Sequence, residues 1–433
     1  MSTPDGALDR KFLGDAAWNY GAFAMMAATG VIFNFFIAAH FGTAALGIFN
    51  QIYAVYIVAA QLAVFGVHDS AQKYVAQHDG DAALRPVIAR TAVGLAAVIG
   101  GAIALCVWAA SGAIGALAAS EPVGQGVALA APGLFLFAVN KVLMGILNGE
   151  RRMKAFALIQ GARVLSILAF ALLVALEGWP AHMLGAAFTV AEAVIAAPLL
   201  ALVKPWRAGG AASGAARAWV RQHLDFGARA LPNGFLAESY VRVDVLMLAV
   251  FVDDAAVGVY SFAAMFIEGL YQVPVVVRTV VNPMLVKLVA AADKPALARF
   301  ARRVMAASLA IFVVTAGIVH VVFPYLAPYF DDGLVSGARA VLLPLTVGLG
   351  VYAAFIPLDF ILMQAGMPGR QSLLMTVNIA INAGLNLLLI PSLGIMGAAM
   401  ATAAAFGLSA LTLNAAAWRW LGMRGGLAVG AGR

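Results

Sequence analysis

Long apolar segments separated by short polar breaks dominate the chain. A membrane-spanning helix needs about 20 mainly apolar residues, and charge clusters or Gly/Pro turns separate twelve segments of this kind. The predicted spans are 14–40, 44–69, 87–110, 125–148, 156–177, 183–203, 224–251, 257–283, 304–325, 339–364, 371–390 and 395–418. Because barrel strands would be alternating segments of about 10 residues, the pattern predicts an all-α polytopic membrane protein.

Composition supports this class. Hydrophobic residues make up 63% of the 433 residues and charged residues 11%, whereas a soluble domain has about 25% charged residues. These proportions argue against the soluble enzyme classes. The single cysteine, Cys106, excludes an intramolecular disulfide framework.

The Lys and Arg residues predict the orientation of the chain. With the N-terminus in the cytoplasm, 22 of the 27 basic residues fall on the inside and only Arg339 lies in an outer loop. This distribution follows the positive-inside rule and predicts that both termini are cytoplasmic. It also accounts for the net charge of +7 without a nucleic-acid partner.

The twelve spans divide into two halves at a polar, Gly- and Ala-rich segment. Residues 44–49 (AALGIF) match 255–260 (AAVGVY), and 185–187 match 397–399 at nearly the same offset. These matches favour parallel repeats, as in some transporters, and therefore two six-helix lobes around a central cavity. The alternative is a compact bundle whose repeat has no mechanistic use. The predicted parts are an N-terminal lobe at 1–203, a cytoplasmic linker at 204–222, a C-terminal lobe at 223–418 and a cytoplasmic tail at 419–433.

Four basic residues lie within predicted spans: Lys141, Arg163, Arg242 and Arg278. A charge at mid-bilayer costs roughly 2.5–3.5 kcal/mol, so each should face a cavity or a partner. Guanidinium groups match phosphate in a bidentate way, and these bases therefore suggest an anionic substrate. For Lys141 and Arg163, snorkelling toward the cytoplasmic surface is the alternative.

One of these bases adjoins a predicted kink. Arg278 follows Pro274 by four residues, and a proline inside a helix removes a backbone hydrogen bond. This arrangement suggests a moving gate at Pro274. No acid lies three or four residues from Arg278, so its partner must be an acid on another helix or a substrate phosphate.

Acidic residues within the spans are candidates for proton or ion coupling: Glu268, Glu238, Asp244 and Asp359. Glu268 leads this group because no base lies three or four residues away, and an unpaired carboxylate at this depth could titrate near neutral pH. Hydrogen bonding as a neutral acid is the alternative. Glu238 precedes Arg242 by four residues and could pair with it, and Asp244 could also neutralise Arg242. Local pairing is the expectation for Asp359.

Motifs for enzymatic chemistry are missing. The sequence contains no Walker phosphate loop, H-E-x-x-H motif or G-x-S-x-G elbow, and its six His residues are scattered. The acidic pairs Asp253-Asp254 and Asp331-Asp332 could hold a metal in a membrane glycosyltransferase, but solvated loop turns explain them better. We therefore expect neither a metal site nor an organic cofactor.

Several stretches resemble bacterial oligosaccharide flippases of the Wzx type, in the multidrug/oligosaccharidyl-lipid/polysaccharide exporter superfamily. Residues 386–391 (NLLLIP) with 393–402 (LGIMGAAMAT) resemble the junction of their last two helices. Residues 147–154 (LNGERRMK) resemble an inner loop, and 243–248 (VDVLML) with 257–263 (VGVYSFA) resemble their seventh and eighth helices. The similarity extends from about Phe12 to Trp420.

This resemblance implies a fold and a function. It implies a V-shaped pair of six-helix lobes, similar to multidrug and toxin extrusion (MATE) transporters, that alternates between inward- and outward-open states. The substrate would be an oligosaccharide repeat unit on undecaprenyl pyrophosphate, moved between leaflets of the bacterial inner membrane. Membrane lipid and the polysaccharide polymerase machinery would be its partners, and a proton or sodium gradient would drive it. Of the basic candidates, Arg242 and Arg278 fit the basic cavity of such relatives best.

Other functions are possible in principle. A MATE-type drug/cation antiporter shares the superfamily but relies on acidic cavity residues. Peptidoglycan-precursor flippases usually have fourteen spans, whereas this chain fits twelve. A membrane glycosyltransferase would usually need a larger outer loop than any here.

Overall fold

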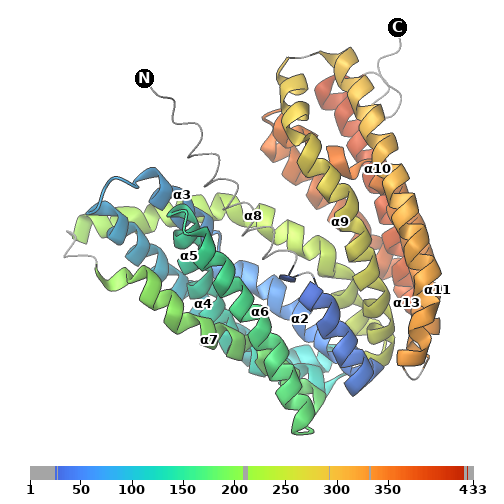
Figure 1. Ribbon diagram of the computed structural model, residues 1–433, viewed down its shortest axis with the longest axis horizontal. Helices are drawn as coiled ribbons and strands as arrows, with labels where there is room; N and C mark the ends of the chain where they lie inside the picture. The colour runs from blue at the N-terminus through green and yellow to red at the C-terminus, as the bar shows by residue number, and fades with distance from the viewer. Residues whose placement is uncertain are drawn as a thin grey trace. The chain divides into compact units, whose positions relative to one another are not determined.

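The computed structural model describes residues 25–26, 28–207, 213–291, 293–330, 333–423 and 427, except for the side chains of 207, 213–214, 233–234 and 237–241. The described residues form helices and no strands (Figure 1). An apolar helix at Ala28–Phe41 comes first. The elements that follow, with η for 3-10 helices, are α2 (Thr43–Val64), α3 (Val67–Gln77), α4 (Leu84–Leu117), α5 (Glu121–Gly149), α6 (Met153–Leu176), η1 (Ala181–Gly185), α7 (Ala186–Val203), η2 (Pro205–Arg207), α8 (Ser213–Phe251), α9 (Asp254–Ala290), α10 (Lys294–Val322), η3 (Phe323–Tyr329), α11 (Leu334–Ala353), η4 (Ile356–Leu358), α12 (Ile361–Gln364) and α13 (Pro368–Leu421).

Nine helical segments within the described residues are long and apolar enough to cross a membrane. The predicted all-α, multi-pass class is therefore confirmed. The helix at 28–41 and the charged helix α8 are not among the nine, and α13 counts once. The total of twelve spans stays a prediction.

The structure tests the predictions at two places where a helix could end. The span predicted at 339–364 is wrong as one helix, because α11 ends at Ala353 and two short helices, η4 and α12, follow. Pro357 lies in η4, where it cannot donate the backbone hydrogen bond that a continuing helix needs. The predicted break before 395 is confirmed, because Gly394 has φ 57° and ψ −134° inside α13. Glycine adopts such a conformation without a Cβ clash.

Side-chain caps fix several helix starts. The Asp253 carboxylate accepts a hydrogen bond of 2.8 Å from the Ala256 amide at the start of α9. Asp293 does the same for Ala296 at the start of α10, at 2.9 Å. Such caps satisfy amides that have no partner within the helix. The first outer acidic pair is thus part of a helix start, and the second, Asp331-Asp332, lies outside the described residues.

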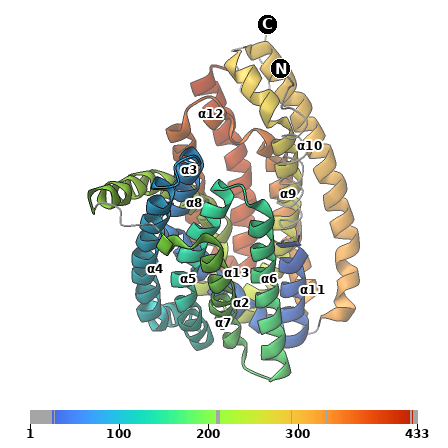
Figure 2. The same ribbon diagram turned by 60° about the vertical axis from the view of Figure 1, so that its left-hand side comes forward.

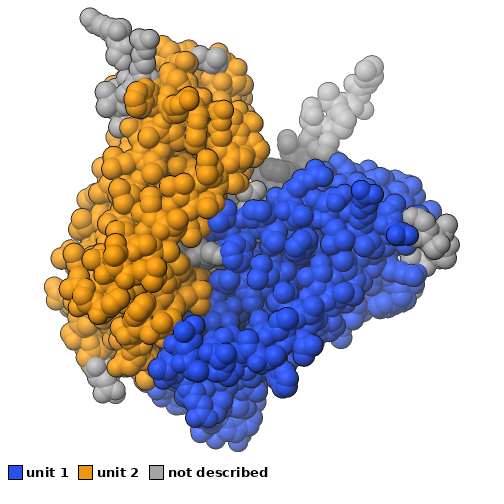
Figure 3. Space-filling view, turned by 180° about the vertical axis from the view of Figure 1, so that it is seen from behind, with its two compact units in different colours: residues 1–41, 48–238 blue, residues 42–47, 239–433 orange. Residues whose placement is uncertain are grey.

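The first of two compact units contains residues 1–41 and 48–238 (blue in Figure 3). Helix α5 is at its centre and packs against α3, α4, α6 and α7. A cluster of buried apolar side chains from α5, α6 and α7, including Leu143, Ile159 and Ile195, holds these helices together. Burial of such side chains stabilises the unit mainly by close packing, since lipid is as apolar as the protein core.

The second unit contains residues 42–47 and 239–433 (orange in Figure 3). Helices α9, α10, α11 and α13 form its main bundle (Figures 1 and 2). Gly47 and Gly258, which occupy equivalent positions in the 44–49 and 255–260 match, lie against each other here. A Cβ atom on Gly258 would collide with the main-chain oxygen of Thr43, and one on Gly47 with that of Asp254. The matched motif therefore marks a close backbone crossing.

The predicted linker has more structure than its composition suggests. Helix η2 lies at its start, and residues 213–222 are already the first turns of α8. The Trp219 ring lies 5.3 Å from the Tyr74 ring of α3. These contacts place the first part of α8 in the first unit, and the unit boundary falls after Glu238 rather than at the predicted lobe start, residue 223.

Candidate functional site

The predicted charged candidates are distributed over both units. Lys141 (α5) and Arg163 (α6) belong to the first unit, and Arg242, Glu268, Arg278 and Asp359 belong to the second. Most of their side chains face another polar or aromatic group of the same unit. The partners decide which of them could bind a ligand.

Arg163 is paired inside the first unit. Its Nε lies 2.8 Å from Glu192 Oε1 on α7, and the side chains are 18% and 2% exposed. Asn140 of α5 donates a hydrogen bond of 2.8 Å to the other carboxylate oxygen. Such a buried pair persists because removing either partner would leave an uncompensated charge. Snorkelling is therefore not needed to explain Arg163.

Lys141 shares an aromatic partner with Arg163. The Lys141 ammonium lies 5.9 Å from the centre of the Phe137 ring, and the Arg163 guanidinium lies 4.9 Å from it. Cations near the face of an aromatic ring are stabilised by its quadrupole. The structure thus brings these two predicted bases together around one ring on α5.

Arg242 and Glu268 form a pair between α8 and α9. Arg242 Nη1 lies 3.0 Å from Glu268 Oε1, and Nη2 lies 3.5 Å from Oε2. The prediction that Glu268 lacks a basic partner is therefore wrong, because the partner comes from a neighbouring helix. The Glu268 side chain is 41% exposed and that of Arg242 is 15% exposed. The side chain of Glu238, the other predicted partner of Arg242, lies outside the described residues.

Asp244 does not pair with Arg242, which corrects that prediction. Its Oδ2 accepts hydrogen bonds from Tyr260 at 2.9 Å and from Thr402 at 2.7 Å. Its Oδ1 accepts one of 2.8 Å from the Asn386 amide. These buried partners come from α9 and from both parts of α13. Asp244 is thus a buried carboxylate held by neutral donors.

The surroundings of Asp244 are rich in oxygen atoms. Asn386 Nδ2 also donates to Asn382 Oδ1, and this leaves Asn386 Oδ1 buried without a hydrogen-bond partner among the described residues. Oxygen ligands suit hard cations. A buried carboxylate with further oxygen atoms beside it is a group that can take up a proton or a hard cation. No group of three His, Cys, Asp or Glu side chains occurs in the described part of the chain.

Arg278 pairs with Asp359. Its Nη1 lies 2.9 Å from each Asp359 carboxylate oxygen, and its guanidinium lies 4.6 Å from the Phe360 ring. Of the two partners left open for Arg278, an acid on another element is therefore the one observed. Pro274 is buried inside α9, four residues earlier. Its role as a gate stays a prediction.

The neutral members of the Asp244 site were not predicted from the sequence, and neither was the row of amides on α13 to which Asn382 and Asn386 belong. Asn378, Asn382 and Asn386 recur every four residues on α13 and are all at least 92% buried. Amides on one face of an otherwise apolar helix are a recognisable signal, since residues four apart share a face. Tyr260 and Thr402 carried no comparable signal.

A family model described as "Polysaccharide biosynthesis protein" matches residues 15–289. The match spans most of the chain. This chain belongs to the polysaccharide biosynthesis protein family. A search of curated proteins finds no significant match.

Several solved structures of other proteins are similar to this chain in fold. The lipid II flippase MurJ in an inward closed conformation has a TM-score of 0.73 and 14% identity, with 90% of this chain and 85% of that chain covered. An inward-facing MATE family multidrug transporter of the MOP superfamily has a TM-score of 0.72 and 15% identity, with 92% and 94% covered. The eukaryotic MATE transporter AtDTX14 has a TM-score of 0.61 and 15% identity, with 93% and 95% covered.

These findings confirm the predicted family and the predicted likeness to the MATE fold, while the two V-shaped six-helix lobes around a central cavity stay a prediction. The polysaccharide biosynthesis protein has the MOP-superfamily fold, shared with MurJ and MATE transporters. The solved structures with this fold are a flippase and MATE transporters, which agrees with the prediction of a transporter-type protein rather than an enzyme. Identities of 14–15% establish the fold alone, so substrate and ion remain to be proposed.

Proposed function

We propose that this polysaccharide biosynthesis protein flips undecaprenyl-pyrophosphate-linked oligosaccharide repeat units from the inner to the outer leaflet of the bacterial inner membrane. Two six-helix lobes would alternate access to a cavity between them. The observation that carries the proposal is the family match over residues 15–289 together with a fold shared with a lipid flippase. A charged, sugar-bearing headgroup cannot cross about 30 Å of hydrocarbon unaided, whereas a polyprenyl tail can remain in lipid.

Arg242 is the best candidate for contact with the pyrophosphate. Each arginine of the three ion pairs is neutralised by a carboxylate, so phosphate must displace that carboxylate to bind. The acid is 2% exposed for Glu192, 12% for Asp359 and 41% for Glu268. Glu268 is the least buried of the three acids and can therefore be displaced from Arg242 most easily. Lys141, Arg163 and Arg278 follow as weaker candidates.

Asp244 is the best candidate for coupling to a proton or sodium gradient. Its partners are neutral and come from three helical segments that pack in the second unit. Proton or cation binding would change the charge at the point where these segments meet. Glu268 and Asp359 are less suitable, because each is paired with an arginine.

The headgroup role is tested in a flippase-deficient strain at matched low expression. We expect Arg242→Ala to abolish complementation and Arg242→Lys to restore part of it, because lysine lacks the guanidinium fork. Arg302→Ala, on the exposed surface of α10, is the control and should complement fully. Full complementation by Arg242→Ala would contradict the assignment.

The coupling role needs purified protein in liposomes with imposed proton or sodium gradients. We expect Asp244→Asn to abolish the response of transport to the gradient while leaving substrate binding within about threefold, since asparagine retains most of the hydrogen-bonding capacity. A folded Asp244→Asn protein with an unchanged gradient response would remove this residue from the mechanism.

A MATE-type cation antiporter remains the second candidate, because the TM-scores to MurJ and to the MATE transporter, 0.73 and 0.72, are nearly equal. The same liposomes separate the two functions. Gradient-driven efflux of a cationic dye without translocation of lipid-linked oligosaccharide would favour the antiporter.

Topology is tested by cysteine labelling in intact cells and inside-out vesicles. The exposed native Cys106 is first replaced by alanine. A cysteine at position 213 should label from the cytoplasm and one at position 336 from the outside. Labelling of both from one side would contradict the twelve-span orientation.

A further inference from the structure

A cavity of about 570 Å³ lies in the first unit, between α3 and the first turns of α8. Its lining includes Lys73, Tyr74, Arg221, Phe226 and Arg229. The predicted orientation puts this end of both helices at the cytoplasmic membrane surface. The cavity contains none of the charged residues assigned above to headgroup binding or ion coupling.

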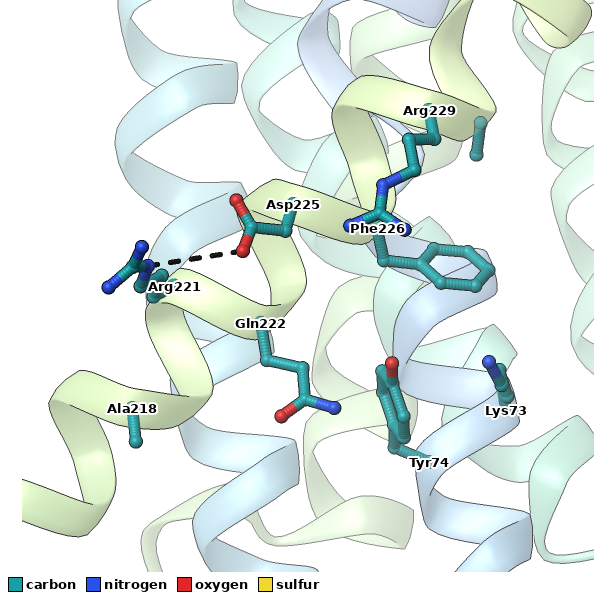
Figure 4. A pocket seen from close by; sticks show the side chains of 9 residues that line it. Lys73, Tyr74, Ala218, Arg221, Gln222, Asp225, Phe226 and Arg229 are labelled. Atoms are coloured by element: carbon teal, nitrogen blue, oxygen red, sulfur yellow. Dashed lines mark ion pairs between the residues drawn. The ribbon is translucent and has the colours of Figure 1, made fainter.

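The lining carries an excess of positive charge. It contains three basic side chains and one acid, Asp225. Asp225 lies 4.0 Å from Arg221, and Figure 4 shows these two turned toward each other on α8. Within the described part of the chain, no carboxylate lies within 4.0 Å of Lys73 or Arg229. Two cations thus face this space with their charge uncompensated by a nearby acid.

Aromatic contacts hold one of these cations in position. The Lys73 ammonium lies 5.0 Å from the centre of the Tyr74 ring and 5.1 Å from that of Phe226. Figure 4 shows the Arg229 guanidinium extending toward Phe226 from the other side, and the Tyr74 hydroxyl pointing into the same space. An anion there would meet an ammonium, a guanidinium fork and a phenol hydroxyl. This combination suits a phosphate group.

The helix that forms one wall is fixed to its neighbours. His223 on α8 is fully buried, and its Nδ1 lies 2.7 Å from Ser70 Oγ of α3. Its Nε2 lies 3.2 Å from the Ile88 carbonyl oxygen of α4. The imidazole therefore donates from Nε2 to the carbonyl and accepts from the Ser70 hydroxyl. Because α8 is held against α3 and α4, the cations from the two walls keep their spacing before a ligand binds.

The first part of α8 also has the character of a helix that lies at a membrane surface. Trp219 and Phe226 face α3 together with His223, whereas Arg217, Arg221 and Arg229 are exposed. Basic clusters on such amphipathic helices bind anionic lipid headgroups. A lipid phosphate would be at the right depth for this cavity.

We propose that the cavity between α3 and α8 binds the phosphate of an anionic membrane lipid, with Lys73 and Arg229 as its principal contacts. This site is independent of the proposed flippase function and would anchor the first turns of α8 at the cytoplasmic surface.

The test titrates phosphatidylglycerol, phosphatidylcholine and inorganic phosphate separately into the full-length protein in neutral detergent, with bound ligand counted by native mass spectrometry. The variant is Lys73→Gln with Arg229→Gln. The control is Arg217→Gln with Arg302→Gln, which removes the same charge from exposed positions outside the cavity. Gel filtration and thermal denaturation verify folding of both variants.

We expect wild-type protein to retain phosphatidylglycerol in preference to phosphatidylcholine. The cavity variant should bind phosphatidylglycerol roughly 10- to 30-fold more weakly, since each basic residue near the surface contributes appreciably to anionic-lipid binding, and the control should stay within about threefold. Equal weakening in the control would overturn the proposal, because it would indicate general surface charge. Binding of inorganic phosphate as tight as that of phosphatidylglycerol would overturn the lipid assignment. Unchanged binding in a folded cavity variant would overturn the site.

Discussion

The pair formed by Arg278 and Asp359 is expected to contribute to folding more than to substrate binding, for which Arg278 is a weaker candidate than Arg242. Both guanidinium–carboxylate distances are 2.9 Å, and the side chains are only 22% and 12% exposed. Asp359→Leu would leave the arginine with the Phe360 ring as its remaining partner, and Arg278→Met would leave the carboxylate without its cation. Each single substitution should therefore destabilise the protein strongly.

The expected size follows from the burial of the pair. Removing one partner of a buried ion pair costs about 3–5 kcal/mol, whereas replacing both by apolar residues is often nearly neutral. Because Arg278 is partly exposed, we expect the lower end, about 3 kcal/mol for each single variant. The double variant Arg278→Met with Asp359→Leu should come within about 1 kcal/mol of the wild type. In terms of melting temperature, each single variant should fall by about 3 °C, because the unfolding entropy of a chain of this length is about 0.9 kcal/mol/K.

Thermal denaturation of the purified protein in detergent provides the double-mutant cycle. Arg302→Met, at an exposed position on α10, is the control and should change the melting temperature by less than about 1 °C. Additive effects of the two substitutions would refute the structural role. So would a stable double variant that still fails to translocate lipid-linked oligosaccharide, because Arg278 would then be needed for something besides its partner.

Three further predictions test other parts of the fold. Burial lowers the pKa of His223 from 6.5 to about 4, so the unfolded chain takes up a proton at a higher pH than the folded protein does. The free energy of unfolding should therefore fall by up to about 3 kcal/mol as the pH drops from about 6.5 to 4, and melting curves of His223→Gln should show a smaller fall. Gly258→Ala should lower the melting temperature because its Cβ meets backbone, whereas Gly269→Ala on the same helix has open space and should be neutral or stabilising by up to about 1 kcal/mol. Glu150→Gln should destabilise the protein by about 1 kcal/mol, since the Glu150 carboxylate is 2.7 Å from one arginine and 3.4 Å from another. Added salt should reduce the difference in melting temperature between this variant and the wild type.

Much of the fold can be predicted from hydropathy. A helix in lipid must form all its backbone hydrogen bonds internally and expose apolar side chains, so it needs a continuous apolar segment. The break at Gly394 was predictable for this reason, from the Pro-Ser-Leu-Gly sequence at 391–394. The first turns of α8 were harder to predict, because their Ala- and Gly-rich composition is typical of a linker. A stronger signal for a helix was the spacing of Trp219, His223 and Phe226, because residues three and four apart share one face of a helix. In the structure this face packs against α3.

The candidate site was predictable as a set of residues and unpredictable as a set of pairs. The buried charges were predictable because an ionisable group in an apolar segment is rare and costly. Sequence spacing identifies partners only on the same helix, three or four residues away, so an acid on another helix could be expected for Arg278 but not named. The observed partner of Arg242 is 26 residues away, and that of Arg278 is 81 residues away. Such pairs depend on how helices pack, which the local pattern does not encode.

The three buried arginine–carboxylate pairs make the interior less positive than the number of buried bases suggests, which matters for the binding of an anionic substrate. Arg163, Arg242 and Arg278 suggest a strongly positive interior when counted along the sequence, but each has a carboxylate within 3.0 Å. A phosphate therefore gains little from long-range attraction and must exchange with a carboxylate at short range. Exchange keeps the number of charges in apolar surroundings nearly constant, so it avoids the cost of an unpaired cation before binding and after release. The proposed flippase would need this property, because its substrate must leave as readily as it enters.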